Sequence, residues 1–275
     1  MSLITITSSF GSGGEKIAKE VSEQLGIELF DDHKVQERAL SMGISSKELE
    51  GIDEKAPRLF DRLFTNKPAV YLDLLGSVIF DIASEGEGLI VGHGAQVFLE
   101  DFNCALHVLI HAPEETRSKT LSEEQNITAE AAMQLVHKMD KRLGDFVQYA
   151  FNRDWKDSSG YDLVINLEKL GTDWAVKLIS DLAGSEEVKT CSIKAIEEME
   201  SSSLKRKIDA AIIKNNHSTI YPDFVVEVTG GGKVHLSGLM FSNDELEKVI
   251  RVIKNVPGVT EVTSEIVIVP SSYGA

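Results

Sequence analysis

Residues 3–26 read LITITSSFGSGGEKIAKEVSEQLG, and this stretch decides the fold that we expect. Residues 3–7 form an apolar, β-prone run, which predicts a strand. Residues 13–25 repeat apolar side chains at helical spacing, which predicts an amphipathic helix that ends at Gly26. A glycine-rich turn between such a strand and such a helix is the usual place for a phosphate-binding loop.

The turn itself leaves two interpretations open. Glycines let a backbone approach a phosphate closely and adopt positive φ, and amides at a helix N-terminus favour an anion. The usual ending Gly-Lys-Ser/Thr is missing, since Glu15 follows the glycines and the first lysine is Lys16. The candidate phosphate-binding residues are Gly11, Ser12, Gly13 and Gly14. The alternative interpretation of the same residues is a plain tight turn.

Apolar strands alternate with helical stretches over residues 1–184. The predicted strands are 27–30, 88–92, 105–112 and 162–167, and the predicted helical regions are 33–85, 114–151 and 171–183. Near-continuous apolar strands are typical of a parallel sheet buried on both faces, so we expect a three-layer α/β domain. In such sheets ligands bind beyond the carboxyl ends of the strands.

The pattern changes after residue 184. Residues 185–203 are polar and are interpreted as a linker. A predicted order α-β-β-α-β follows, with helices at 204–215 and 243–255 and strands at 224–228, 233–238 and 260–269. The strands alternate apolar and polar residues, which indicates a sheet with one solvated face. We therefore predict a second, small α+β domain over residues 204–270.

Composition limits the class of protein. A formal net charge of −16 argues against a nucleic-acid partner, and a hydrophobic content of 42% can bury a core. We expect neither a signal peptide nor a transmembrane segment, and hence a cytoplasmic protein. Cys104 and Cys191 are expected to be reduced thiols, and no metal site is predicted because neither cysteine has metal-binding spacing.

Taken together, the motifs of residues 1–184 resemble the cytidylate kinase-like family, which are P-loop relatives of nucleoside monophosphate kinases. The matching segments are GSGGEKIA (11–18), GIELFD (26–31), DEKAP (53–57), IVGHGA (90–95), VLIHAP (108–113), KMDKR (138–142), NRDW (152–155) and YDLVIN (161–166). The resemblance implies a P-loop αβα fold and transfer of the γ-phosphoryl group of ATP, with Mg²⁺, to a nucleoside monophosphate such as CMP.

The resemblance also implies roles for residues. The loop glycines would hold ATP phosphates, and Lys16 is the candidate for the displaced catalytic charge. Asp31 matches an aspartate on the acceptor side, where further candidates are Arg38, Arg58 and His93. Lys141, Arg142 and Arg153 lie in the region that matches the lid, and the alternative interpretation of them is a solvated helix face.

The chain departs from the family at four positions where arginine is usual: Ser9, Glu15, Asp32 and His93. Phosphoryl transfer depends on positioning and positive charge, so these losses weaken a kinase unless other basic residues compensate. Two hypotheses stay open. One is a divergent active kinase, and the other is a kinase-like domain that binds nucleotide or a partner without turnover.

Residues 204–269 resemble a BON domain through LKRKIDAAI (204–212), VVEVTGGGKVHLSG (225–238) and the PGV at 257–259. The glycines are expected to serve a hairpin turn rather than a ligand. The segment has no polybasic patch, so a regulatory or assembly role is predicted over attraction to anionic lipid, with the ligand or partner unknown.

Overall fold

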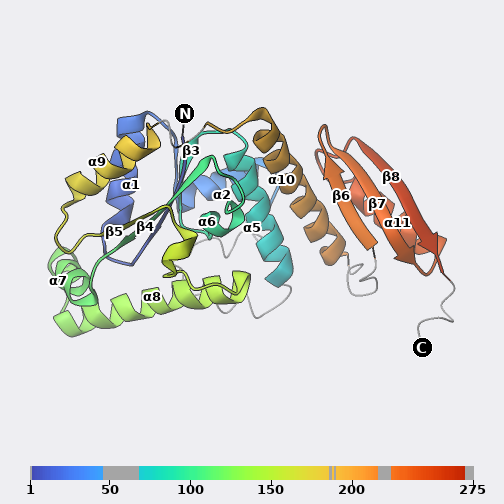
Figure 1. The fold of residues 1–275 in the computed structure, drawn as a ribbon. Helices are drawn as coiled ribbons and strands as arrows, with labels where there is room; N and C mark the ends of the chain where they lie inside the picture. The colour runs from blue at the N-terminus through green and yellow to red at the C-terminus, as the bar shows by residue number, and fades with distance from the viewer. Residues whose placement is uncertain (1, 46–67, 186–187, 189, 216–223, 270–275) are drawn as a thin grey trace. The chain divides into compact units, whose positions relative to one another are not determined.

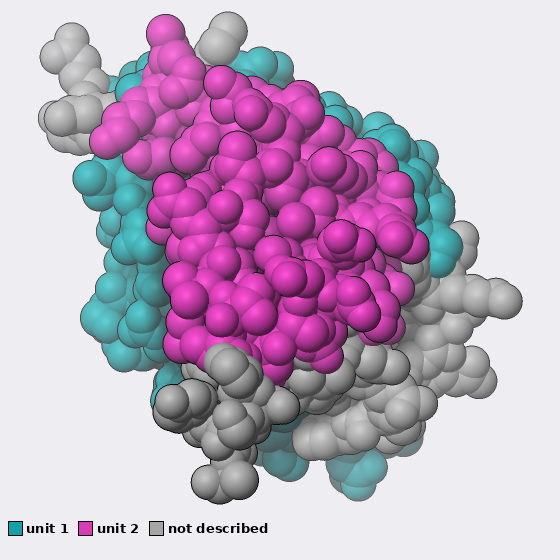
Figure 2. All heavy atoms as spheres, turned by 90° about the vertical axis from the view of Figure 1, so that its right-hand side faces the viewer, with its two compact units in different colours: residues 1–61, 85–192 teal, residues 62–84, 193–275 magenta. Residues whose placement is uncertain are grey.

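The computed structural model describes residues 2–45, 68–185, 188, 190–215 and 224–269, and Figure 1 shows its ribbon. The chain divides into two compact units, coloured separately in Figure 2. Unit 1 comprises residues 1–61 and 85–192, and unit 2 comprises residues 62–84 and 193–275. The chain therefore passes from one unit to the other three times.

Unit 1 is built on a five-stranded parallel sheet with the order β2-β3-β1-β4-β5. The strands are β1 (Leu3–Ser8), β2 (Leu29–Phe30), β3 (Gly88–Val91), β4 (Ala105–His111) and β5 (Leu163–Asn166). All five predicted strands are confirmed. β1 lies at the centre of the sheet, and its residues 3–7 are buried, as a strand covered on both faces requires.

Helices cover both faces of this sheet. On one face, α1 (Gly14–Leu25) and α9 (Thr172–Ala183) pack together over Ile4 and Ile6 of β1. The short helix α6 (Ala95–Phe98) lies on the other face (Figure 1). The remaining elements of unit 1 are α2 (Asp32–Ser41), α7 (Glu114–Gln125), α8 (Ala129–Phe151) and the 3₁₀ helix η1 (Ser158–Gly160). The predicted α/β three-layer fold is confirmed.

The helical stretch predicted over 114–151 is two helices. Asn126 adopts a left-handed conformation with φ 52° and ends α7. Thr128 then begins α8, because its side chain accepts a hydrogen bond of 3.2 Å from the amide of Ala131. In the earlier helical stretch, residues 46–67 lie outside the described residues, and with them the DEKAP segment and Arg58.

Unit 2 contains a three-stranded sheet with order β6-β7-β8, in which β6 and β7 are antiparallel and β7 and β8 parallel. Its elements are α5 (Pro68–Ala83), α10 (Ile193–Lys214), β6 (Phe224–Thr229), β7 (Lys233–Met240), α11 (Asn243–Lys254) and β8 (Glu261–Ile268). The predicted α-β-β-α-β order is confirmed. Gly231 and Gly232 both have φ 76°, which supports their predicted role in the hairpin turn.

Two features of unit 2 differ from the sequence pattern. Residues 193–203, interpreted as linker, form the first half of α10. In addition, α5 comes from the middle of the kinase-like segment but packs along α10. Between these helices, Ser203 Oγ donates a buried hydrogen bond of 2.8 Å to the carbonyl of Ser77, and Arg206 pairs with Asp73 at 2.9 Å. None of the described helices is long and apolar enough to cross a bilayer.

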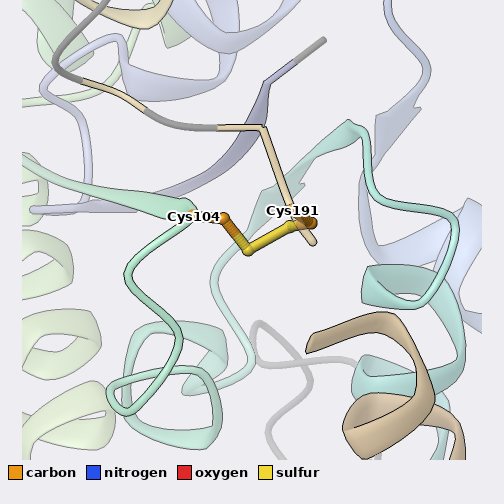
Figure 3. The surroundings of a disulfide bond; sticks show 2 residues. All are labelled: Cys104 and Cys191. Carbon is orange, nitrogen blue, oxygen red and sulfur yellow. A yellow bond between two sulfur atoms is a disulfide. The ribbon is translucent and has the colours of Figure 1, made fainter. Parts of the chain in front are cut away.

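The expectation of two reduced thiols is wrong. Cys104, directly before β4, forms a disulfide with Cys191, and one residue separates Cys191 from the start of α10 (Figure 3). The two residues are 87 positions apart in sequence, but their Cα atoms lie 4.9 Å apart and both side chains are buried. The pairing depends on the course of the chain after α9, which the spacing of the cysteines cannot reveal.

Candidate functional site

The glycine-rich loop joins β1 to α1 at the carboxyl edge of the sheet. Gly11 and Gly13 have φ of 76° and 85°, and Gly13 is the N-cap of α1. A side chain at Gly14 would overlap the Cβ and Oγ atoms of Ser8, so the helix can begin this close to β1 only with glycine there. The loop therefore places the N-terminal amides of a twelve-residue helix directly after the carboxyl end of β1.

Ser12 lies within this loop, and its hydroxyl oxygen is buried without a hydrogen-bond partner among the described residues. Buried hydroxyls are almost always satisfied by the protein, water or a ligand. The residues present therefore fit a bound phosphate, which would offer oxygen atoms to the Ser12 hydroxyl and to the helix amides.

No group of three or more potential metal ligands occurs among the residues that the structure describes. Mg²⁺ commonly takes one or two carboxylates together with substrate phosphates, so it would arrive with the nucleotide.

A buried ion pair that sequence reasoning missed holds the start of the loop. The side chains of Arg117 on α7 and Asp140 on α8 are only 3% and 7% exposed, and Arg117 Nη2 lies 2.8 Å from Asp140 Oδ2. Arg117 Nη1 donates to the carbonyl of Phe10 at 2.8 Å, and Asp140 Oδ1 accepts from the amide of Phe10 at 3.1 Å. Arg117 Nε also donates to the carbonyl of Ala112 at 2.8 Å. The pair therefore connects the ends of β1 and β4.

Two of the four positions where the resemblance implies arginine lie together. His93 follows β3, is fully buried and has φ 58°, and its Nε2 lies 3.1 Å from Asp32 Oδ1 at the start of α2. Neighbouring Asp31 is the N-cap of α2, where its carboxylate accepts from the amide of Lys34 at 3.0 Å. An imidazole and a carboxylate thus lie in contact at two positions where the resemblance implies arginines.

The other predicted cations lie on exposed or partly exposed surfaces, most of them beside carboxylates. Lys16 Nζ is 3.8 Å from Glu20 on α1, with 72% of its side chain exposed. Lys141 pairs with Asp145 at 2.9 Å, Arg153 with Glu100 at 3.0 Å, and Arg38 with Glu85. Arg142 contacts the sulfur of Met139 at 3.8 Å. Exposed pairs of this kind contribute about 0–1 kcal/mol, so these side chains can turn toward a bound anion at low cost.

The C-terminal end of α8 packs against the loop that carries His93. The ring of Phe151 makes edge contacts with Phe98 and Phe146, and a side chain at Gly94 would overlap it. Past this helix end, the carbonyl of Trp155 accepts a hydrogen bond of 2.7 Å from the hydroxyl of Tyr161. Burial raises the pKa of Tyr161 to about 12, so its hydroxyl stays protonated and keeps donating at neutral pH. Within the NRDW segment, Trp155 is buried in unit 1, whereas Asn152, Arg153 and Asp154 are exposed.

Comparison with known proteins agrees with these features. The model of the cytidylate kinase-like family matches residues 3–169, and that of the BON domain matches residues 201–270. A cytidylate kinase from Sulfurisphaera tokodaii is 28% identical over 180 residues, which are 64% of this chain and 92% of that protein. A crystal structure of an uncharacterized protein from Eubacterium ventriosum ATCC 27560 aligns with a TM-score of 0.53 and 24% identity. It covers 66% of this chain and 97% of its own, and this likeness is one of fold.

Proposed function

The chain belongs to the cytidylate kinase-like family and carries a C-terminal BON domain, and from this premise we propose that it is a nucleoside monophosphate kinase. It would transfer the γ-phosphoryl group of ATP to a cytidylate-like acceptor, and the BON domain would regulate it. The observation that supports the proposal most is the loop at residues 11–14, where buried Ser12 Oγ has no partner in the described structure beside the N-terminus of α1.

Each part of the site would contribute positioning or charge, which is what phosphoryl transfer requires. Gly11–Gly14 and Ser12 would hold the ATP phosphates through backbone amides and one hydroxyl. Mg²⁺, when bound with ATP, would neutralise phosphate charge. Lys16 would leave Glu20 and turn toward the transferred group, since their exposed pair is weak. Lys141, Arg142 and Arg153 would add charge from α8 and the turn after it.

On the acceptor side, Asp31 and Arg38 would contact the nucleoside monophosphate, and Arg58 is a further candidate for this role. His93 would contribute through its contact with Asp32, which joins the start of α2 to the loop after β3. This pair lowers the positive charge available to the acceptor phosphate. We therefore expect turnover well below that of an enzyme with arginine at both positions, because one cationic contact at a transferring phosphoryl is worth about 10³-fold.

The absence of arginine at positions 32 and 93 also favours the second hypothesis, in which the domain binds nucleotide without turnover and signals to unit 2. Calorimetric titration of the full-length chain with ATP and Mg²⁺, with and without CMP, tests binding directly. Micromolar affinity that CMP strengthens is the expected result. Absence of heat at millimolar nucleotide would show that the loop is only a turn.

Turnover is then measured as CDP formation, and Lys16 has a matched control one turn further along α1. Lys19 pairs with Glu23 at 3.9 Å and is 70% exposed, close to the 72% of Lys16. Lys16→Ala should reduce kcat by about 10³-fold, whereas Lys19→Ala should leave it unchanged. Equal rates for the two variants would remove Lys16 from the mechanism. Tight ATP binding without CDP formation would establish the binding module.

A further inference from the structure

The backbone of Phe10 is held on both sides by one buried ion pair. Its amide donates to Asp140 Oδ1 at 3.1 Å, and its carbonyl accepts from Arg117 Nη1 at 2.8 Å. Phe10 directly precedes Gly11, where the backbone turns through φ 76° into the loop. The orientation of the Phe10 peptide groups thus sets the direction in which the loop leaves β1.

The guanidinium of Arg117 donates hydrogen bonds to three segments of the chain at once. Its donors reach Phe10 after β1, Ala112 after β4, and both carboxylate oxygens of Asp140 on α8. Planar guanidinium groups fix geometry in a way that an ammonium group cannot. The side chain is only 3% exposed, so its polar atoms are satisfied by these protein partners and not by water.

Stability alone does not explain this pair. Removing two charges from water costs free energy, and apolar residues of similar volume often replace a buried ion pair without loss of stability. Apolar residues would fill the same space, but they could not bond to the amide and carbonyl of Phe10. What the charged pair provides in addition is orientation of one peptide unit and its connection to α8.

We propose that Arg117 and Asp140 are positioning residues that fix the phosphate-binding loop in its binding conformation and hold α8 in register with it. The proposal rests on the proposed function, because it takes the loop to be the phosphate site. Lys141 and Arg142 follow Asp140 directly on α8. The pair therefore also sets the distance between the candidate lid cations and the loop, and displacing α8 requires its buried bonds to break.

The test compares full-length wild type with the double variant Arg117→Met/Asp140→Leu, which keeps the volume but removes the polar contacts. Two quantities are measured: amide hydrogen exchange of Phe10 by NMR, and the dissociation constant for ATP by calorimetry. We expect exchange at Phe10 to become at least about tenfold faster and the dissociation constant to rise at least about tenfold. The midpoint of thermal unfolding should stay at or above that of wild type.

A matched double control removes an exposed pair on another helix of unit 1. Lys177 and Asp181 lie 2.6 Å apart on α9 with more than half of each side chain exposed, and Lys177→Met/Asp181→Leu should change neither quantity. If the Arg117/Asp140 double variant does not fold, Arg117→Lys replaces it. That variant keeps the charge but cannot hold both carboxylate oxygens of Asp140 as the guanidinium does. Because Asp140 Oδ1 is the acceptor of the Phe10 amide, a carboxylate that is held less firmly should still make exchange at Phe10 faster.

The two arms separate failure of this inference from failure of the proposed function. Unchanged exchange at Phe10 in the folded variant would overturn the positioning role, whatever the ATP result. Faster exchange with an unchanged dissociation constant would overturn the link between this pair and phosphate binding. If wild type binds no ATP, the proposed function fails, and the exchange arm still decides whether the pair fixes the loop.

Discussion

Asp73 on α5 makes the packing of α5 against α10 dependent on pH. Only 15% of its side chain is exposed, and its carboxylate lies 2.9 Å from Arg206 on α10. Burial, followed by repulsion from Asp209, raises the pKa of Asp73 from 3.8 to about 6, and the attraction of Arg206 offsets this only in part. Folding therefore makes protonation of Asp73 easier than it is in the unfolded chain.

The sign and size of the pH effect on stability follow from the difference between the pKa of Asp73 in the folded and in the unfolded chain. Because the pKa of Asp73 is higher in the folded chain, protonation stabilises the fold, fully below pH 3.8, and this stabilisation disappears as pH rises through about 6. A difference of roughly two pKa units corresponds to about 3 kcal/mol at most, at about 1.4 kcal/mol per unit. Asp73→Asn cannot ionise, so it lacks this contribution to the pH dependence.

The assay is urea unfolding of wild type and Asp73→Asn, followed by circular dichroism between pH 4 and 7. The unfolding free energy of wild type minus that of the variant should fall by up to about 3 kcal/mol as pH rises across this range. The ¹³C carboxyl signal that disappears in Asp73→Asn should titrate near pH 6 in wild type. A flat difference curve, or one that rises with pH, would show that the attraction of Arg206 outweighs burial.

Three further changes test the packing described above. Gly14→Ala introduces a Cβ that overlaps Ser8, so it should lower the free energy of unfolding by about 1–3 kcal/mol. Gly160→Ala places its Cβ in open space and should change the free energy of unfolding little. Equal effects of the two substitutions would contradict the close approach of Gly14 to Ser8. Thiol titration of the denatured, unreduced chain should find no free thiol, and two reactive thiols would disprove the disulfide. Cys191→Ser should lower the free energy of unfolding by about 4 kcal/mol, because the disulfide joins residues that are 87 positions apart. Ile79 on α5 is fully buried, so Ile79→Ala should lower the free energy of unfolding in urea by about 2–5 kcal/mol. Val225 is 55% exposed, so Val225→Ala should lower it by less than about 0.5 kcal/mol.

The strands and helices could be predicted because local pattern determines them. The apolar run of β1 and the helical spacing of α1 are contained in residues 3–25, and the glycines of the loop mark the turn between them. The resemblance to a family then identified the fold, since its motifs follow the strand ends. The break in the predicted helix over 114–151 also had a local signal, because Asn126 and Thr128 are residues that end and begin helices.

The site contacts could not be predicted, because they join residues far apart in sequence. Asp32 and His93 were each seen as a lost arginine, and only the structure shows that they lie 3.1 Å apart. Arg117 sits in a charged helical segment and was not singled out from the sequence, yet it is buried against Asp140. A signal was available, since Arg117 lies four residues after the HAP motif that ends β4, and Asp140 lies within the KMDKR segment.

The position of α5 in the chain has a consequence for folding during synthesis. This almost entirely apolar helix ends at residue 83, but its partner α10 begins at residue 193, about 110 residues later. At roughly 5–20 residues per second, the ribosome needs about 5–20 s to produce the partner. During that interval the side of α5 that α10 will cover has no native partner, so nascent chains are most prone to aggregate between the synthesis of these two helices. Conditions that slow elongation over residues 84–192 should therefore lower the yield of folded protein more than slowing elsewhere.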